Sequence, residues 1–287
     1  MEYFLDMPSR YNSYENASTV LLPVPFDGTS TFVKGADKGP QAIIDASDSI
    51  ELYDVEEEVE IYTCGIHTAQ SVKQLQTVEE MTQEVYLRTN KYILDKKLIC
   101  LLGGEHSVSL GAIKAVSEIY KPLTVLQLDA HADLRESYHD SKYNHACVMR
   151  RAQELAKVVQ VGIRNVCIEE KPFIVPQNMF YAHKIYGHKE WMLQAINQLD
   201  KNVYLTIDLD CFDPSIVPST GTPLPGGMLW QDVIEFLSLV IKHKNVVGFD
   251  VVELCPNPYD KSSDVLAAVL VYKIITKIMK KNMPLYK

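Results

Sequence analysis

The sequence lacks the features that mark secreted and membrane-spanning proteins. Its six cysteines lie far apart and form no C-x-x-C pair, which in a chain of this length indicates reduced thiols rather than a disulfide framework. No apolar run approaches the ~18 to 20 residues that a membrane span needs. The first six residues contain neither a basic region nor a long apolar stretch. We therefore expect a cytoplasmic protein with no membrane partner.

Positive charge is also scarce. The 28 Lys and Arg residues are outnumbered by 37 Asp and Glu residues, so the formal net charge is -9 at pH 7. This balance argues against a nucleic-acid partner and is compatible with a cationic small-molecule substrate. With 287 residues, 47% of them hydrophobic, the chain is long enough to bury one sizeable core.

Apolar runs alternate with helical patterns, and this alternation predicts an α/β fold with a mostly parallel sheet and helices on both faces. The expected strands cover residues 19–25, 61–66, 98–102, 123–128, 158–162, 179–183, 203–207 and 245–252. The expected helices cover residues 41–49, 78–96, 108–120, 145–156, 188–199, 230–242 and 260–280. Since no linker or repeat interrupts the pattern, we expect a single domain over residues 1–287, with residues 1–18 as an N-terminal extension packed on it.

One polar cluster stands directly after the apolar run 123–128. It consists of Asp129, His131 and Asp133, and on an extended backbone these alternate side chains would point to the same side. Carboxylates that converge repel each other unless a positive charge lies between them. The cluster therefore predicts a metal site, and the alternative is a polar strand end whose carboxylates are simply solvated.

Three more polar clusters follow other expected strands. They are Gly103-Gly104-Glu105-His106, Asp208-Leu209-Asp210 with the turn-like pair Asp213-Pro214, and Glu253. Because sites in parallel sheets form beyond the carboxyl ends of the strands, we expect all four clusters to meet. Four aspartates and two histidines without a thiolate favour manganese over a structural zinc site, and suit two ions that share ligands. Two ions can bind a water between them and supply hydroxide at neutral pH, which points to hydrolysis of a poor electrophile.

Three of these stretches resemble the signature motifs of the ureohydrolases, the arginase and agmatinase family. They are Gly103-Gly104-Glu105-His106-Ser107, Asp129-Ala130-His131-Ala132-Asp133 and Asp208-Leu209-Asp210-Cys211-Phe212-Asp213-Pro214. The resemblance runs over nearly the whole chain. It implies a three-layer α/β/α arginase-like fold in one domain, assembled as a homo-oligomer, either a trimer or a hexamer.

The resemblance also implies two Mn²⁺ ions per chain. The ligands of one ion would be His106, Asp129, Asp133 and Asp208. Those of the other would be Asp129, His131, Asp208 and Asp210, with Asp129 and Asp208 bridging. His145 matches the family's proton-shuttling histidine, and Glu253 matches the carboxylate that pairs with the substrate guanidinium. Asp133 is expected to relay a proton toward the leaving nitrogen, so the implied catalytic residues are His145, Asp133 and Glu253.

Two positions depart from the pattern of many family members. Glu105 stands where many have Asp, and Ala146 stands where many have Gly. The segment Gly221-Thr222-Pro223-Leu224-Pro225-Gly226-Gly227 is more similar to agmatinases than to arginases. These departures affect the choice of substrate more than the catalytic chemistry.

Arg135 bears on the same choice, because arginases typically carry an asparagine at this position. We expect Arg135 to form an ion pair with Glu136 or Asp140 rather than to face the substrate. The pattern then favours hydrolysis of agmatine to putrescine and urea, a step of polyamine biosynthesis. Arginase, guanidinobutyrase and formiminoglutamase activities stay open as alternatives, as does a non-catalytic metal-binding relative.

Overall fold

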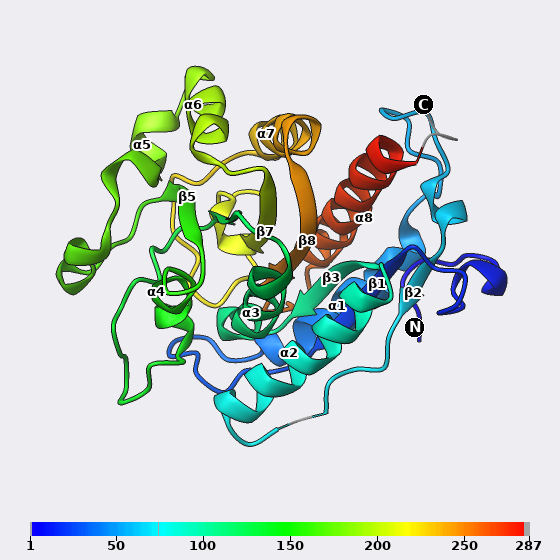
Figure 1. The fold of residues 1–287 in the computed structure, drawn as a ribbon, viewed down its shortest axis with the longest axis horizontal. Coiled ribbons are helices and arrows are strands. Elements are labelled where there is room, and N and C mark those ends of the chain that lie inside the picture. The colour runs from blue at the N-terminus through cyan, green and yellow to red at the C-terminus, as the bar shows by residue number, and fades with distance from the viewer. Residues whose placement is uncertain (1, 74, 284–287) are drawn as a thin grey trace.

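An eight-stranded sheet organises the computed structural model, which describes residues 2–73 and 75–283 (Figure 1). The strands lie in the order β2-β1-β3-β8-β7-β4-β5-β6, and every neighbouring pair is parallel. Their bounds are β1 Thr19–Val24, β2 Ile66–Thr68, β3 Leu98–Gly103, β4 Leu123–Leu128, β5 Lys157–Ile163, β6 Met179–Tyr181, β7 Asn202–Asp208 and β8 Asn245–Val252. The expected parallel sheet is confirmed.

Helices follow most of the strands. They are α1 Gly39–Ala46, α2 Val78–Leu94, α3 Ser109–Ile119, α4 Val148–Ala152, α5 Ala182–Ile185, α6 Glu190–Gln198, α7 Trp230–His243 and α8 Ser262–Asn282. Helix α2 begins with a capping box, in which the Thr77 hydroxyl accepts the backbone N–H of Glu80 and the Glu80 carboxylate accepts that of Thr77. The long α8 lies against the sheet together with α1 (Figure 1).

Two sequence-based expectations are wrong in detail. Residues 61–66 do not form a strand, because Ile61–Cys64 is a 3-10 turn and β2 starts only at Ile66. Gly65 lies between them with a φ of 81°, and a Cβ there would stand 2.6 Å from the Cα of Ala17. The helix expected at 145–156 is shorter, a 3-10 turn at His145–Cys147 followed by α4.

The core lies on both faces of the sheet. Along β3, Cys100 and Leu102 belong to one buried apolar cluster while Ile99 and Leu101 belong to the other, as the two-residue period of a strand requires. Helices α1, α6, α7 and α8 contribute to the first cluster, and α2, α3 and α4 to the second. The expected three-layer α/β/α architecture is therefore confirmed.

The N-terminal segment is attached to this body by backbone hydrogen bonds. Phe4 and Leu5 are buried, and their N–H groups donate to the hydroxyls of Thr68 and Ser47 at 2.8 and 2.7 Å. None of the described helices combines the length and apolar character that crossing a bilayer would demand.

The strand order determines where the polar clusters meet. Strands β3, β8, β7 and β4 are successive neighbours at the centre of the sheet, so their carboxyl ends lie side by side. The segments that follow them carry the four polar clusters of the sequence. His106 and Glu253, 147 residues apart in the chain, are joined by a hydrogen bond of 2.8 Å from the His106 N–H to Glu253 Oε1.

Candidate metal and catalytic site

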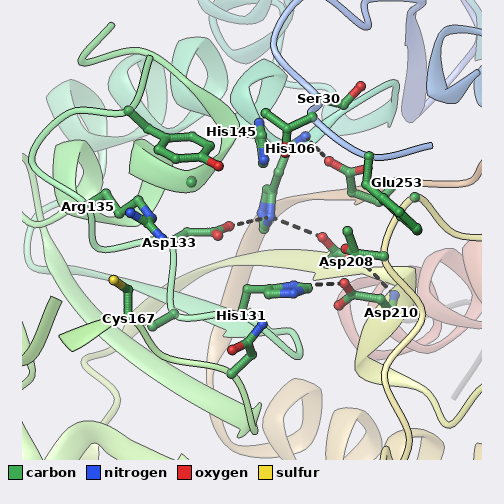
Figure 2. A pocket seen from close by; sticks show the side chains of 18 of the residues that line it. Ser30, His106, His131, Asp133, Arg135, His145, Cys167, Asp208, Asp210 and Glu253 are labelled. Atoms are coloured by element: carbon green, nitrogen blue, oxygen red, sulfur yellow. Dashed lines mark hydrogen bonds and ion pairs between the residues drawn. The ribbon is translucent and has the colours of Figure 1, made fainter. Parts of the chain in front are cut away.

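The predicted site residues converge on a cavity of about 370 Å³ beyond the carboxyl ends of the central strands (Figure 2). Its lining includes eight of the side chains singled out from the sequence, namely His106, His131, Asp133, Arg135, His145, Asp208, Asp210 and Glu253. Asp129 lies directly beneath this lining, fully buried, with its carboxylate oxygens near both metal-type histidines. The prediction that the four clusters meet is therefore confirmed by the geometry.

The cluster after β4 converges for a different reason from the one expected. Strand β4 ends at Leu128, so Asp129, His131 and Asp133 do not alternate along an extended strand. Asp133 instead has a φ of 52°, in the left-handed region that non-glycine residues seldom adopt. Glu253, just past β8, has a φ of 67°. Two strained residues aimed into one cavity are typical of functional sites, where the surrounding structure holds the strain.

The imidazole of His106 is held in a defined orientation by contacts on its Nε2 side. Its Nε2 lies 2.8 Å from the Thr206 hydroxyl, and that hydroxyl donates its proton to Asp250 Oδ1 at 2.7 Å. Tyr204 donates to the other oxygen of Asp250 at 2.8 Å. Because the Thr206 proton is committed to Asp250, Nε2 of His106 must be the donor toward Thr206. Neutral His106 then carries its lone pair on Nδ1.

Nδ1 of His106 faces three carboxylates. Oxygens of Asp133, Asp129 and Asp208 lie 3.0, 3.1 and 3.4 Å from it. Figure 2 shows His106 between Asp133 and Asp208. Yet Nδ1 counts as a buried atom without a hydrogen-bond partner in the described chain. A lone pair facing three carboxylate oxygens is repulsive unless a cation lies among them. The surroundings of Nδ1 of His106 therefore fit a bound metal ion.

A second potential ligand group adjoins the first and shares Asp129. It comprises Asp129, His131 and Asp210, with His131 Nδ1 2.9 Å from Asp210 Oδ2 and 3.6 Å from Asp129 Oδ1. The first group consists of His106, Asp129 and Asp208. In each group, the potential ligand atoms lie within 4.8 Å of one another. Two adjacent groups that share a carboxylate have the donor set of a two-ion site, all oxygen and imidazole nitrogen.

The pKa shifts describe an uncompensated negative charge. Burial, with the charge of Asp129 beside it, raises the pKa of Asp133 to about 7. Burial and the charges of Asp210 and Asp129 raise the pKa of Asp208 well above its usual value. Burial lowers the pKa of His131, but the charges of Asp210 and Asp129 outweigh it and raise the pKa to about 12. All three shifts show a site that takes up positive charge, whether as protons or as metal ions.

His145 and Glu253 lie in the same cavity, outside the two ligand groups (Figure 2). Burial and the neighbouring charges of His106 and His131 lower the pKa of His145 to about 4. Burial and the charge of Glu105 raise the pKa of Glu253 well above its usual value. Within residues 2–73 and 75–283, no lysine or arginine forms an ion pair with Glu253. A buried carboxylate in that position is suited to a cationic ligand.

Arg135 forms an ion pair, but not with the expected partner. Its Nη1 lies 3.3 Å from Glu169 Oε2, and its guanidinium lies 4.5 Å from the ring centroid of Tyr138. Glu136 pairs instead with Arg150 and Arg151 on the 145–152 segment. The prediction of an ion pair is correct and the choice of Glu136 or Asp140 is wrong, because the 3-10 helix Ile168–Phe173 after β5 supplies Glu169 as the partner.

Several supporting residues were not identified from the sequence. Gln127 donates to Asp129 Oδ2 at 2.6 Å, and Gln160 donates to Gln127 Oε1 at 2.5 Å and to the Ala132 carbonyl at 2.7 Å. Arg164 donates to the carbonyls of Asp210 and Leu224, both at 2.7 Å. A glutamine inside a run of buried strand residues, as in Val125–Leu128, is the one sequence signal that could have pointed to such support. The remaining contacts depend on which strands are neighbours.

Comparison with known proteins gives consistent matches. A model of the arginase family matches residues 17–277. The N(1)-aminopropylagmatine ureohydrolase of Synechocystis sp. is 35% identical over 274 residues, covering 92% of this chain and 90% of that protein. The agmatinase of Pyrococcus horikoshii is 33% identical over 91% of this chain and 92% of its own length. The solved structure of the agmatine ureohydrolase of Thermoplasma volcanium is 31% identical, with a TM-score of 0.85 over 94% of this chain and 93% of that one.

Proposed function

The chain belongs to the arginase family, and we propose that it hydrolyses agmatine with one water molecule to urea and putrescine at a two-manganese centre. One observation carries this proposal. The buried Nδ1 of His106 faces three aspartate oxygens in a cavity that also contains the carboxylate of Glu253, which has no lysine or arginine partner among residues 2–73 and 75–283. The first feature suits a cation held by the protein, and the second suits a cation brought by the substrate.

In this proposal the two ligand groups hold one ion each. The first group with Asp133 added, that is His106, Asp129, Asp133 and Asp208, would hold one ion, and the second with Asp208 added, that is Asp129, His131, Asp208 and Asp210, would hold the other. Bound manganese would lower the pKa of a coordinated water enough to supply hydroxide near neutral pH. Hard oxygen donors with some imidazole favour manganese over zinc, because structural zinc sites typically contain soft thiolate ligands.

Glu253 orients the substrate. Its Oε1 accepts the His106 N–H, which leaves Oε2 and a further lone pair of Oε1 for two parallel N–H groups of a planar guanidinium. Binding in this way places the guanidinium carbon above the ligand cluster and converts a bimolecular attack into a positioned one. The substrate cation also offsets the cost of burying the Glu253 charge.

Asp133 and His145 move protons. Asp133, whose Oδ2 lies 3.0 Å from Nδ1 of His106, can take a proton from the attacking water and pass it to the nitrogen that leaves. His145 lines the same cavity outside the two ligand groups and can carry a proton between solvent and the departing amine. Resonance makes the guanidinium carbon a poor electrophile, so both transfers are needed to release urea and an amine.

Selection between agmatine and arginine has to occur at the far end of the substrate, because both carry the same guanidinium. Arginine adds a carboxylate, and the described lining of the cavity contains five carboxylates and one guanidinium, that of Arg135. Arg135 is already paired with Glu169. Stripping water from the extra carboxylate without a partner costs several kcal/mol, of which ~3 kcal/mol already gives about a hundredfold preference.

A second substrate candidate is the N(1)-aminopropyl derivative of agmatine. It is favoured by the activity for which the Synechocystis relative is named, and that relative is 35% identical over 92% of this chain. The derivative has the same guanidinium and a longer cationic tail, so the same ligand groups and Glu253 would serve it.

An assay of urea release tests both candidates. Manganese-loaded protein is given agmatine, its N(1)-aminopropyl derivative, arginine and guanidinobutyrate. We expect kcat/KM for agmatine to exceed that for arginine by at least about a hundredfold. Similar values for these two, or a preference for guanidinobutyrate, would contradict the agmatine assignment while leaving guanidino hydrolysis in place.

We also propose that the chain assembles as a homotrimer or a hexamer of two trimers, by analogy with the family. Light scattering coupled to size exclusion would measure the mass directly. A monomeric mass at micromolar concentration would contradict this assembly.

A further inference from the structure

A buried carboxylate beside the site belongs to neither ligand group. Glu105 is fully buried and precedes His106 in the chain, and its oxygens accept hydrogen bonds from Thr29 and Ser107. Oε1 accepts the hydroxyls of Thr29 at 2.9 Å and Ser107 at 2.8 Å, and the Thr29 N–H at 3.2 Å. Oε2 accepts the Ser107 N–H at 2.8 Å. Four donors facing two oxygens leave Glu105 in the role of acceptor only.

Thr29 connects this carboxylate to His145. The Thr29 hydroxyl oxygen accepts the backbone N–H of His145 at 2.9 Å and lies 3.2 Å from Nδ1 of the same residue. A hydroxyl has one proton to donate and two lone pairs. Its proton goes to Glu105, since a hydrogen bond to a carboxylate is roughly twice as strong as a neutral one. Both lone pairs are then left for the two nitrogens of His145.

We propose that the Glu105–Thr29 pair positions His145 and holds it as the tautomer with its proton on Nδ1. The inference goes one step beyond the proposed function and rests on it for the catalytic consequence. With Nδ1–H donating to Thr29, the second ring nitrogen, Nε2, carries the lone pair. The nitrogen free to take up a proton is therefore always the same one. Glu105 and Thr29 touch neither substrate nor metal in this account and act through His145.

A similar carboxylate–threonine pair contacts His106, but at the opposite ring nitrogen. There the pair is Asp250 and Thr206, and the threonine faces Nε2 instead of Nδ1. In both cases a threonine gives its only proton to a buried carboxylate and so can only accept from the imidazole. His106 is left with Nδ1 directed at the aspartates, and His145 is left with Nε2 free.

Neutron diffraction tests the tautomer directly. Deuterium-exchanged crystals of the full-length, manganese-loaded protein are used at about pH 8, above the ordinary histidine pKa of ~6.5. We expect deuterium on Nδ1 of His145, none on Nε2, and the Thr29 deuterium directed at Glu105. Deuterium on Nε2 would overturn the proposal. This result is decisive even if the protein released no urea from any guanidino compound, so it separates the tautomer from the proposed function.

Enzyme kinetics test whether the positioning of His145 by Thr29 affects turnover. Thr29→Val removes the hydroxyl at constant shape, and we expect kcat to fall by about ten- to hundredfold, the range for a misplaced catalytic group, with bound manganese unchanged. Thr29→Ser restores the hydroxyl and is expected to recover most of kcat. The matched control is Thr89→Val on α2, a fully buried threonine whose hydroxyl has no hydrogen-bond partner in the described chain. A folded Thr29→Val with wild-type kcat, or a Thr29→Ser as slow as the valine variant, would overturn the positioning role.

Discussion

Replacing Thr206 by valine removes the group that orients His106 while leaving every proposed metal ligand in place. The fully buried Thr206 hydroxyl lies 2.8 Å from His106 Nε2 and 2.7 Å from Asp250 Oδ1. Valine has nearly the same shape but neither accepts nor donates a hydrogen bond. The imidazole can then rotate or change tautomer, so Nδ1 no longer presents its lone pair to the aspartates at all times.

The expected size of the effect follows from losing such a supporting contact. Removing the partner that orients a metal-binding histidine typically costs 10- to 100-fold in metal affinity, or about 1.4 to 2.7 kcal/mol. The variant also removes the partner of the His106 N–H and one of the donors to Asp250, and an unsatisfied buried group costs about 1 to 3 kcal/mol of folding stability. We therefore expect weaker manganese binding and a lower Tm in the presence of a chelator.

Calorimetric titration of manganese into chelator-stripped protein measures the affinity, and thermal unfolding in chelator measures the stability. Thr89→Val again serves as the control for a buried threonine-to-valine change. If Thr206→Val lost stability but bound manganese as tightly as the wild type, the hydroxyl would be a packing contact only. The tautomer argument for His106 would then be wrong.

The other predictions concern ligands, proton transfer and folding stability. Asp208→Ala should lower the bound manganese, measured by elemental analysis, and abolish urea release, because Asp208 serves both ions; retention of two ions would refute that role. His145→Ala should keep the manganese and slow turnover by about 10² to 10⁴, the range for acid–base groups, and a wild-type rate across pH 6 to 9 would exclude the role. Lys273→Met should reduce the free energy of unfolding in denaturant by about 3 to 5 kcal/mol, since it leaves the buried Asp54, 2.8 Å away, without its cation. A loss below ~1 kcal/mol, the value of an exposed pair, would show that Asp54 does not depend on Lys273.

Most of the fold could be predicted from the sequence because its signals are local. The strands after which the polar clusters stand are continuous apolar runs, and β4, β7 and β8 match their expected spans to within one residue. The failure at residues 61–66 is also local in origin. Gly65 turns the chain against Ala17, so the apolar residues before it are buried by a turn rather than by a strand.

The set of residues that line the cavity could be predicted in large part, but their geometry could not. Parallel strands place their carboxyl ends at one edge of the sheet, and the clusters meet because β3, β8, β7 and β4 are also successive neighbours. The contacts behind the ligands also depend on this order. Thr206 reaches His106 and Asp250 only because β7 lies beside β8, which in turn lies beside β3. The positive φ of Asp133 likewise has no sequence signal comparable to a glycine.

The ion-pair partner of Arg135, a residue of the cavity lining, also could not be predicted from the sequence. The nearest acidic neighbour of Arg135 in sequence, Glu136, lies with Arg150 and Arg151, whereas Glu169 is supplied by a segment 34 residues further along. A charge pattern along the chain predicts that an arginine is paired but does not identify its partner when the backbone between them forms no helix. The partner of Arg135 could therefore not be derived before the fold was known.

The most direct test of the account is a manganese titration followed by its catalytic readout. Chelator-stripped protein is titrated with manganese, and urea release from saturating agmatine is measured at each step. We expect no urea release without metal. The rate should rise as manganese is added and reach its plateau at about two ions per chain, as a two-metal site requires. A plateau at one ion, or urea release by the metal-free protein, would contradict this account.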